Sequence, residues 1–207
     1  PDSVTPAISE LTLTLMLSLL RNIVISDKEI KNKNWTRMSG RRIGACKVGV
    51  LGFGRVGSKL CELLVPFNPT SVLIHDINYD DEKIFKLKKM GLSIEKASFE
   101  ELLINSDLIS IHLSLNSKTA NLFTENEFDI MKPTSMLVNT SRGGIISESC
   151  LHAALSNKNI AGAALDVFEN EPYDGELINL DNVILSPHQG SATIDCRKKM
   201  EMEAVNE

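Results

Sequence analysis

The feature that most constrains the fold is a glycine-rich turn between an apolar run and an amphipathic run. Residues 47–53 (KVGVLGF) are largely apolar and β-prone, and the sequence continues GRVGSKLCELL. Gly52, Gly54 and Gly57 have the spacing G-x-G-x-x-G. A strand that passes through such glycines directly into a helix is typical of the first unit of a doubly wound α/β sheet. The turn therefore predicts a parallel sheet with helices on both faces.

The rest of the chain continues this alternation of strands and helices. Five further apolar runs have the length and composition of parallel strands that are covered on both faces: 71–76, 107–113, 135–141, 160–167 and 182–186. Helices are expected between them, with N-caps at Ser98, Thr124, Ser147 and Ser191. The pattern predicts the α/β class, a doubly wound parallel sheet of the Rossmann dinucleotide-binding type.

The glycine turn also indicates a ligand. Gly52 permits the tight turn, Gly54 lets a pyrophosphate approach the backbone, and Gly57 lets helix and strand pack closely. Asp76 ends the next strand, 19 residues after Gly57. A carboxylate there would accept ribose hydroxyls and repel a 2′-phosphate, so the sequence favours NAD over NADP. The alternative is a glycine-rich turn with an unrelated surface aspartate.

Four chemically active side chains follow the later strands. Arg142, Asp166, Glu171 and His188 all stand at or just beyond the ends of predicted strands. The carboxyl ends of parallel strands share one edge of the sheet, where the ligand crevice lies. Histidine is suited to proton transfer because its unperturbed pKa is about 6.5. We therefore expect acid–base chemistry at this edge; the alternative for His188 alone is a structural histidine in a turn.

Composition narrows the classes of protein further. The net charge of −5 and the pI of about 5.5 argue against a nucleic-acid partner. The four cysteines are scattered singly without metal-ligand spacing, so we expect no metal site and a reducing, cytoplasmic location. Residues 11–20 (LTLTLMLSLL) are too short to span a membrane. They predict a helix buried on several sides, covered by another domain or a second subunit.

Together these motifs resemble the NAD-binding domain of the D-isomer-specific 2-hydroxyacid dehydrogenases. The resemblance covers roughly residues 7 to 200 and rests on ELTLTLMLSLLR, VGVLGFGRVG, MKPTSMLVNTSRGG, AGAALDVFENEP and NVILSPHQGSA. Two positions depart from the family pattern. Ser114 stands where the family usually has proline, and Gln189 follows the histidine where an apolar residue is usual. Neither departure removes a reacting group, but both could shift cofactor affinity or substrate preference.

The resemblance implies a role for each site residue. Arg142 would bind the substrate carboxylate and polarise its carbonyl. His188 would donate a proton to the carbonyl oxygen as hydride arrives from the nicotinamide, and Glu171 would hold the orientation of the imidazole. The implied cofactor-binding set is Gly52, Gly54, Arg55, Val56, Gly57, Asp76, Thr140, Ser141, Arg142, Asp166, His188 and Gly190.

The resemblance also implies a domain organisation. Residues 1–25 would form an inter-domain and dimerisation helix, 26–192 the NAD-binding domain, and 193–207 the start of a helix that returns to a second, substrate domain. Most of that second domain would be absent, so we expect weak or no turnover from this chain alone. The expected partners are a small 2-hydroxy or 2-oxo acid and a second copy in a homodimer, with neither nucleic acid nor membrane.

Several readings of the function remain open. Within the family, the glyoxylate and hydroxypyruvate reductases are the nearest branch, and the phosphoglycerate dehydrogenases are also close. The alternatives are an NAD-sensing, non-catalytic dimer similar to the corepressors that share this domain, or an inactive truncated fragment.

Overall fold

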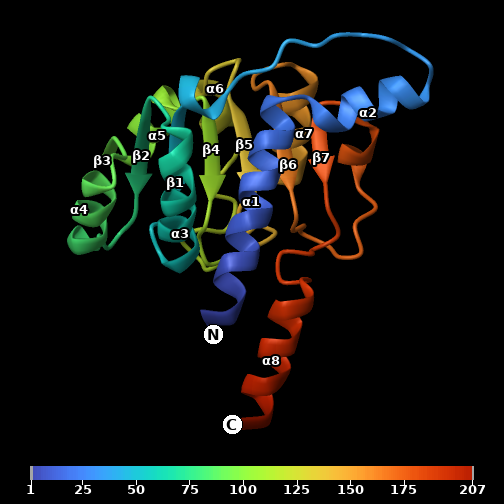
Figure 1. Cartoon of the computed structure of the whole chain (residues 1–207). Helices are drawn as coiled ribbons and strands as arrows, with labels where there is room; N and C mark the ends of the chain where they lie inside the picture. Colours follow the sequence, from blue (N-terminus) through green and yellow to red (C-terminus); the bar gives the residue numbers. More distant parts are fainter. Residues whose placement is uncertain (1, 207) are drawn as a thin grey trace.

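The computed structural model describes residues 2–206 and contains a seven-stranded parallel sheet (Figure 1). Its strand order is β3-β2-β1-β4-β5-β6-β7. The strands are β1 Lys47–Leu51, β2 Ser71–His75, β3 Ile94–Lys96, β4 Leu108–Ile111, β5 Met136–Asn139, β6 Gly162–Leu165 and β7 Val183–Leu185. The chain winds outward from β1 in both directions, which confirms the predicted doubly wound topology.

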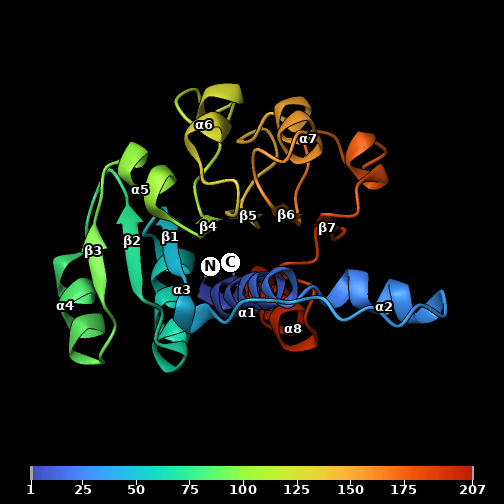
Figure 2. The same ribbon diagram turned by 90° about the horizontal axis from the view of Figure 1, so that it is seen from above.

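Helices cover both faces of this sheet (Figure 2). One face carries α1 (Thr5–Leu20), α3 (Arg55–Leu64) and α4 (Asp81–Lys89), and the other carries α5 (Phe99–Asn105), α6 (Glu125–Ile130) and α7 (Glu148–Ser156). Helix α2 (Ile23–Lys31) projects sideways from the top of α1, and α8 (Ile194–Asn206) leaves the opposite end, below the carboxyl ends of the strands. Short 3-10 helices span Asp2–Val4, Ile43–Ala45, Val65–Phe67 and Glu176–Asn179.

The sheet separates two apolar cores. Alternate strand residues point to opposite faces, so Val48 and Val50 of β1 pack in the core beneath α1 and α3, whereas Leu51 packs in the core beneath α5 to α7. All three are essentially inaccessible to solvent. Burying an aliphatic side chain of this size contributes roughly 1.5–3 kcal/mol, so the central strand stabilises both layers at once.

Helix α1 lies along one face of the sheet and begins near the carboxyl ends of the strands (Figure 1). Its buried face includes Ser9, Thr12 and Met16, while Leu13 and Leu17 are partly buried. Among the described residues, no single helix has the length and apolar composition needed to cross a membrane; α1 and α2 meet that criterion only as a pair bent by 60°.

Most of the N-cap residues predicted from the sequence mark the observed starts of helices. The capping boxes at Ser98 and Thr124 and the Ser147 cap are confirmed. The expected cap at Ser191 is wrong: α8 begins at Ile194, and the Thr193 hydroxyl accepts a hydrogen bond from the Cys196 N–H at 3.2 Å. Strand β3 was not predicted because only its first residue, Ile94, is buried.

Candidate active site

The glycine turn between β1 and α3 depends on close backbone contacts. Gly52 has a φ of +96°, and a Cβ there would lie 2.6 Å from the His112 carbonyl oxygen. A Cβ on Gly57 would lie 2.0 Å from the Gly52 carbonyl oxygen, so only glycine lets α3 approach this closely. A Cβ on Gly54, in contrast, would have no neighbour within 4 Å. The space above Gly54 therefore lies open at the start of α3.

The start of α3 suits a phosphate. The helix begins at Arg55 after the extended Gly54, and no side chain caps it. The N–H groups of a first helical turn, together with the helix dipole, favour an anion. The open turn and the uncapped helix thus fit the pyrophosphate of a dinucleotide, with the Arg55 and Val56 backbone at the contact.

Asp76 lies directly beside this turn, at the end of β2. Its carboxylate accepts hydrogen bonds from the Phe53 N–H at 2.5 Å and from the Asn78 N–H at 2.9 Å, and the residue is half-buried. The sequence had suggested a role toward a ribose. The structure adds a second role: Asp76 holds the backbone of the glycine turn against β2.

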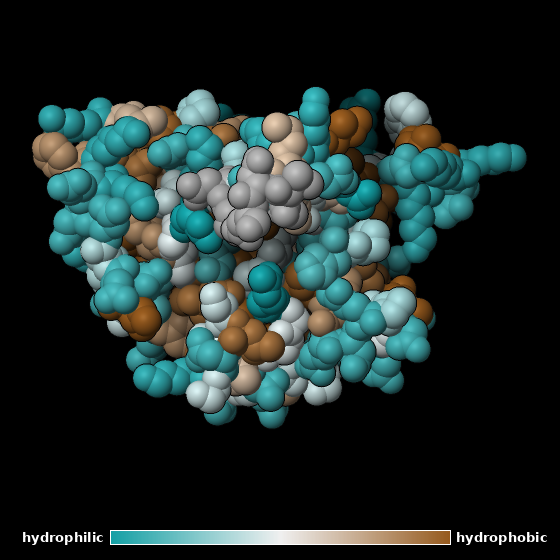
Figure 3. Space-filling model, turned by 90° about the horizontal axis from the view of Figure 1, so that it is seen from below, coloured by the Kyte–Doolittle hydropathy of each residue, from teal (hydrophilic) through white to brown (hydrophobic). Residues whose placement is uncertain are grey.

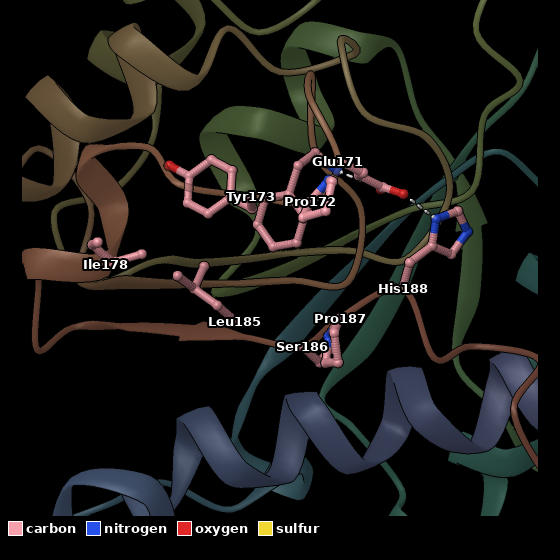
Figure 4. A pocket seen from close by; sticks show the side chains of 9 residues that line it. Glu171, Pro172, Tyr173, Ile178, Leu185, Ser186, Pro187 and His188 are labelled. Carbon is pink, nitrogen blue, oxygen red and sulfur yellow. Dashed lines mark hydrogen bonds and ion pairs between the residues drawn. The ribbon is translucent and has the colours of Figure 1, made fainter.

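His188 and Glu171 form a hydrogen-bonded pair in the loops after β7 and β6 (Figure 4). His188 Nδ1 lies 2.7 Å from the Glu171 carboxylate, and the two side chains are 51% and 38% exposed. The hydrogen bond with His188 holds the pKa of Glu171 below its usual value. An ionised carboxylate can only accept, so Nδ1 is the donor. The other ring nitrogen, Nε2, faces away from Glu171 and is the atom available for proton transfer.

Arg142 lies in the turn after β5, with an exposed side chain. The backbone of this turn is fixed by Asn139, which is only 2% exposed. The Asn139 amide nitrogen donates to the Arg142 carbonyl at 3.0 Å, and its amide oxygen accepts from the Ser141 N–H at 3.0 Å. Asn139 was not predicted as a functional residue, although an asparagine directly before such a turn is a recognisable signal.

The loops that carry Arg142 and Glu171 are packed against each other. A Cβ on Gly143 would lie 1.7 Å from the Phe168 carbonyl oxygen, so the two backbones touch at this glycine. The Phe168 N–H in turn donates to the Glu171 carboxylate at 3.1 Å. The structure therefore links the Arg142 turn to the Glu171–His188 pair through the backbone.

Five of the expected cofactor residues are buried: Gly52 and Gly57 in the glycine turn, and Thr140, Asp166 and Gly190 after later strands. Asp166 is fully buried, Thr140 is 6% exposed, and Gly190 is also buried. The Thr140 hydroxyl is hydrogen-bonded to the hydroxyl of Thr12 on α1 at 2.7 Å. Ser141 is partly exposed, and its hydroxyl donates to Asn139 at 2.7 Å.

An apolar cavity of about 640 Å³ lies on the Glu171 side of the His188 ring (Figure 4). Phe168 and Tyr173 stack at its wall with ring centroids 4.3 Å apart, and Ile178 and Leu185 extend it. The Nε2 atom of His188 faces away from this cavity. At the strand-end face of the molecule, apolar and hydrophilic side chains are interspersed (Figure 3). Within residues 2–206, no cluster of His, Cys, Asp and Glu could hold a metal ion.

Comparison with known sequences settles the family. Residues 13–190 match the family described as "D-isomer specific 2-hydroxyacid dehydrogenase, NAD binding domain". The chain belongs to this family. The predicted membership in the 2-hydroxyacid dehydrogenases, the Rossmann-type fold and the assignment of NAD as the family's cofactor are thereby confirmed.

Individual relatives agree with this assignment. A glyoxylate reductase of Thermofilum pendens is 35% identical and is matched over 100% of this chain and 62% of its own length. A D-3-phosphoglycerate dehydrogenase of Methanocaldococcus jannaschii is 35% identical, over 96% of this chain and 37% of its own length. The chain thus spans less than two thirds of the curated relatives it matches.

Solved structures show the same similarity. The crystal structure of a glyoxylate reductase from Paecilomyes thermophila superposes with a TM-score of 0.89 at 31% identity, covering 100% of this chain and 62% of that one. A D-isomer specific 2-hydroxyacid dehydrogenase from Lactobacillus delbrueckii ssp. bulgaricus, in its NAD complexed form, gives a TM-score of 0.86 at 25% identity, covering 98% of this chain and 65% of that one.

Proposed function

We propose that this chain binds NAD(H) and supplies the acid–base half of a dehydrogenase that interconverts D-2-hydroxy acids and 2-oxo acids. The observation that carries the proposal is the hydrogen bond between His188 Nδ1 and Glu171 at 2.7 Å, at the edge of the sheet that also carries the glycine turn. The family membership supports the same activity. A glyoxylate-type 2-oxo acid is the substrate class that the relatives suggest, and the hydroxypyruvate type stays a prediction from the sequence.

The cofactor, when bound, supplies the hydride that reduces the substrate carbonyl carbon. Arg142 binds the substrate carboxylate through its planar guanidinium, which matches carboxylate geometry. Glu171 accepts from His188 Nδ1 and so fixes the imidazole with Nε2 toward the crevice. Nε2 then delivers a proton to the carbonyl oxygen as the hydride arrives, and it takes that proton back in the oxidation of a hydroxy acid.

The remaining residues at the carboxyl ends of the strands are the ones proposed to bind the cofactor. The N–H groups at Arg55 and Val56 bind the pyrophosphate above Gly54, and Asp76 accepts from the adenosine ribose and disfavours a 2′-phosphate. Thr140, Ser141, Asp166 and Gly190 form the nicotinamide side of the site. The proposal thereby favours NADH over NADPH.

The proposed domain organisation follows the sequence expectation. Residues 1–25 form the inter-domain and dimerisation helix, 26–192 the NAD-binding domain, and 193–207 the start of a returning helix. Helix α2 extends from Ile23 to Lys31 and so crosses the first of these boundaries. A homodimer and a cytoplasmic location stay predictions.

The first test is a titration of this chain with NADH and with NADPH, in which binding is measured by calorimetry or by nucleotide fluorescence. Saturable binding of NADH with weaker binding of NADPH is the expected result. Equal affinity for both cofactors would contradict the role of Asp76, and binding of neither would remove the support for a cofactor site in this chain.

The second test addresses proton transfer. In a protein that combines this chain with a substrate domain of its relatives' length, His188→Ala should lower the turnover of 2-oxo acids by at least about 100-fold. NADH binding should persist, because His188 touches the substrate rather than the pyrophosphate. Retained turnover would exclude His188 as the acid–base group, whereas no turnover in the parent protein itself would favour the non-catalytic, NAD-sensing alternative.

A further inference from the structure

Two glutamates, Glu148 and Glu169, bind each other's backbone. The Glu169 N–H donates to the Glu148 carboxylate at 2.6 Å, and the Glu148 N–H donates to the Glu169 carboxylate at 2.9 Å. Glu148 is the first residue of α7, whereas Glu169 lies in the loop after β6, 21 positions further along the chain. Two reciprocal hydrogen bonds therefore tie the start of a helix to this loop.

Capping of α7 does not explain this pair. Ser147 is the N-cap residue of the helix, and its hydroxyl already accepts from the Cys150 N–H at 3.5 Å. The two carboxylates also repel each other: burial, together with the negative charge of Glu169, raises the pKa of the Glu148 carboxyl. A like-charge contact that the helix does not need for its cap is typical of a position where geometry is kept at some cost in stability.

The tied loop carries the hydrogen-bond partner of His188. The Phe168 N–H, one residue before the tied N–H of Glu169, donates to one carboxylate oxygen of Glu171 at 3.1 Å. The other oxygen of Glu171 accepts from His188 Nδ1 at 2.7 Å (Figure 4). Because the Glu171 side chain is exposed, its carboxylate depends on the backbone of residues 168 and 169 for a fixed position.

The other end of the tie leads back to Arg142, which lies six positions before Glu148 in the chain. Between these two residues, the backbone of Gly143 lies against the same loop: a Cβ there would be 2.8 Å from the Glu169 nitrogen. The Arg142 turn and the loop after β6 thus meet twice, by backbone contact at Gly143 and by hydrogen bonds at Glu148. This double contact sets the separation between Arg142 and the loop that orients His188.

We propose that Glu148 and Glu169 are positioning residues that hold the two loops of the site at the separation that the reaction needs, without touching substrate or cofactor. The inference rests on the proposed roles of Arg142 and His188. These two groups act on one substrate from different loops, and a displacement of about 1 Å between such groups lowers the rate steeply. The effect falls on the chemical step, because neither glutamate is among the residues proposed to bind the cofactor.

Three variants separate the tie from general effects on folding. Glu148→Ala removes the acceptor of the Glu169 N–H. Glu148→Gln keeps an amide oxygen that can still accept from that N–H, and it removes the repulsion between the two charges. Glu127→Ala is the matched control, because the Glu127 carboxylate is also partly buried and also accepts from a backbone N–H at a helix start, that of Thr124 at 2.8 Å. That bond is part of the cap of α6 and joins no loop of the site.

The tie is tested in this chain, without any ligand, by amide hydrogen exchange measured by NMR. Glu148→Ala should accelerate exchange at the Glu169 amide at least about tenfold, while the central-strand amides of Val138 and Val50 keep their protection. Glu169→Ala should do the same at the Glu148 amide. Glu148→Gln and Glu127→Ala should leave exchange at Glu169 within about threefold of the parent chain. No acceleration in Glu148→Ala, or the same acceleration in Glu127→Ala, would overturn the proposal.

The consequence for the reaction is tested in the protein that carries a substrate domain. Glu148→Ala should lower kcat for a 2-oxo acid at least about tenfold and change the Kd of NADH less than about twofold. Glu148→Gln and Glu127→Ala should keep kcat within about twofold of the parent protein. A loss of kcat in Glu148→Gln as large as in Glu148→Ala would assign the effect to the charge and overturn the positioning role. An equal loss in Glu127→Ala would assign it to general destabilisation, with the same consequence.

The positioning role and the proposed function fail in different ways. If the parent protein has no turnover, the proposed function fails together with the catalytic consequence of the pair, whereas the exchange experiment still decides whether the pair ties the loops. If His188→Ala abolishes turnover but Glu148→Ala keeps it, the proposed function stands and the positioning role of Glu148 fails.

Discussion

Among single residues, Asp76 combines a structural contact with a proposed contact to the cofactor. One carboxylate oxygen accepts from the Phe53 N–H in the glycine turn, and the other accepts from Asn78. Each carboxylate oxygen has a further acceptor site. A variant at this position must therefore separate the loss of the turn contact from the loss of the charge.

Asp76→Ala and Asp76→Asn make that separation. Asp76→Ala should weaken NADH binding and reduce discrimination against NADPH, because it removes both the turn contact and the negative charge. In Asp76→Asn the amide oxygen can still accept from Phe53, so NADH affinity should fall less while NADPH binding improves. Titration of both cofactors checks this. Selectivity unchanged in both variants would count against the ribose role.

Among the secondary-structure elements, the junction of β1 and α3 contains two glycines with different roles. Gly57 is required for packing, because a Cβ at this position would lie only 2.0 Å from the Gly52 carbonyl oxygen. Gly54 is not required for packing, since a Cβ there meets nothing within 4 Å. A motif of identical residues thus contains one structural position and one position open to a ligand.

Gly57→Ala and Gly54→Ala should therefore behave differently. Gly57→Ala forces a methyl group against backbone and should lower the free energy of unfolding by about 1–3 kcal/mol or more. Gly54→Ala should change stability by less than about 1 kcal/mol but should weaken NADH binding, because the methyl group occupies the space proposed for the pyrophosphate. Urea unfolding and NADH titration of both variants measure this. Equal stability losses would contradict the distinction.

Helix α1 is joined to the strand ends by a buried hydroxyl pair. Thr12 and Thr140 are 128 positions apart in the chain and share a hydrogen bond of 2.7 Å. The Thr12 hydroxyl also lies 2.7 Å from the Ile8 carbonyl one turn earlier. Thr14 makes the same local bond to Glu10 at 2.8 Å, but on the exposed side of the helix.

Thr12→Val should lower the free energy of unfolding by about 1–3 kcal/mol, since the buried Thr140 hydroxyl loses its partner. Thr14→Val is the matched control, because it makes the same change of side chain and loses the same local bond. It should stay within about 0.5 kcal/mol of the parent chain. Chemical denaturation of both variants gives the comparison, and equal effects would show that the tie to Thr140 contributes nothing.

At the scale of the whole molecule, the imidazole of the partly buried His112 links stability to pH. Burial lowers the pKa of His112 to about 4, and its Nε2 lies 2.9 Å from the Ser110 hydroxyl. The unfolded chain binds this proton near pH 6.5, so between pH 6.5 and about 4 the unfolded state holds more protons than the folded state. Stability therefore falls as the pH is lowered through that interval.

The decrease in the free energy of unfolding that His112 causes should be below about 3 kcal/mol, because the residue is partly accessible to solvent. Urea unfolding at intervals between pH 7 and pH 4 measures it. His112→Gln should have a flatter profile over the same interval, since glutamine does not titrate. A variant with the same slope as the parent chain would assign the pH dependence to other groups.

The sequence by itself determined the fold class and the cofactor of the family, and it predicted the chain positions of the candidate site residues. These depend on local patterns: a G-x-G-x-x-G spacing after an apolar run, two-sided apolar strands, and reactive residues directly after strands. The parallel sheet then brings Arg142, Glu171 and His188 to one edge, because all its strands end there. Strand β3 escaped prediction because two of its three residues, Glu95 and Lys96, are exposed.

Only the tertiary structure decided which groups hold the site residues in place. The Gly143 contact with Phe168, the Thr12–Thr140 pair and the Glu148–Glu169 pair join loops and elements that are far apart in the sequence. No local pattern contains such contacts, because they depend on how neighbouring strands are registered and how closely their loops approach. The sequence placed Asp166 at the crevice, and the structure buried it beneath the loop that carries His188.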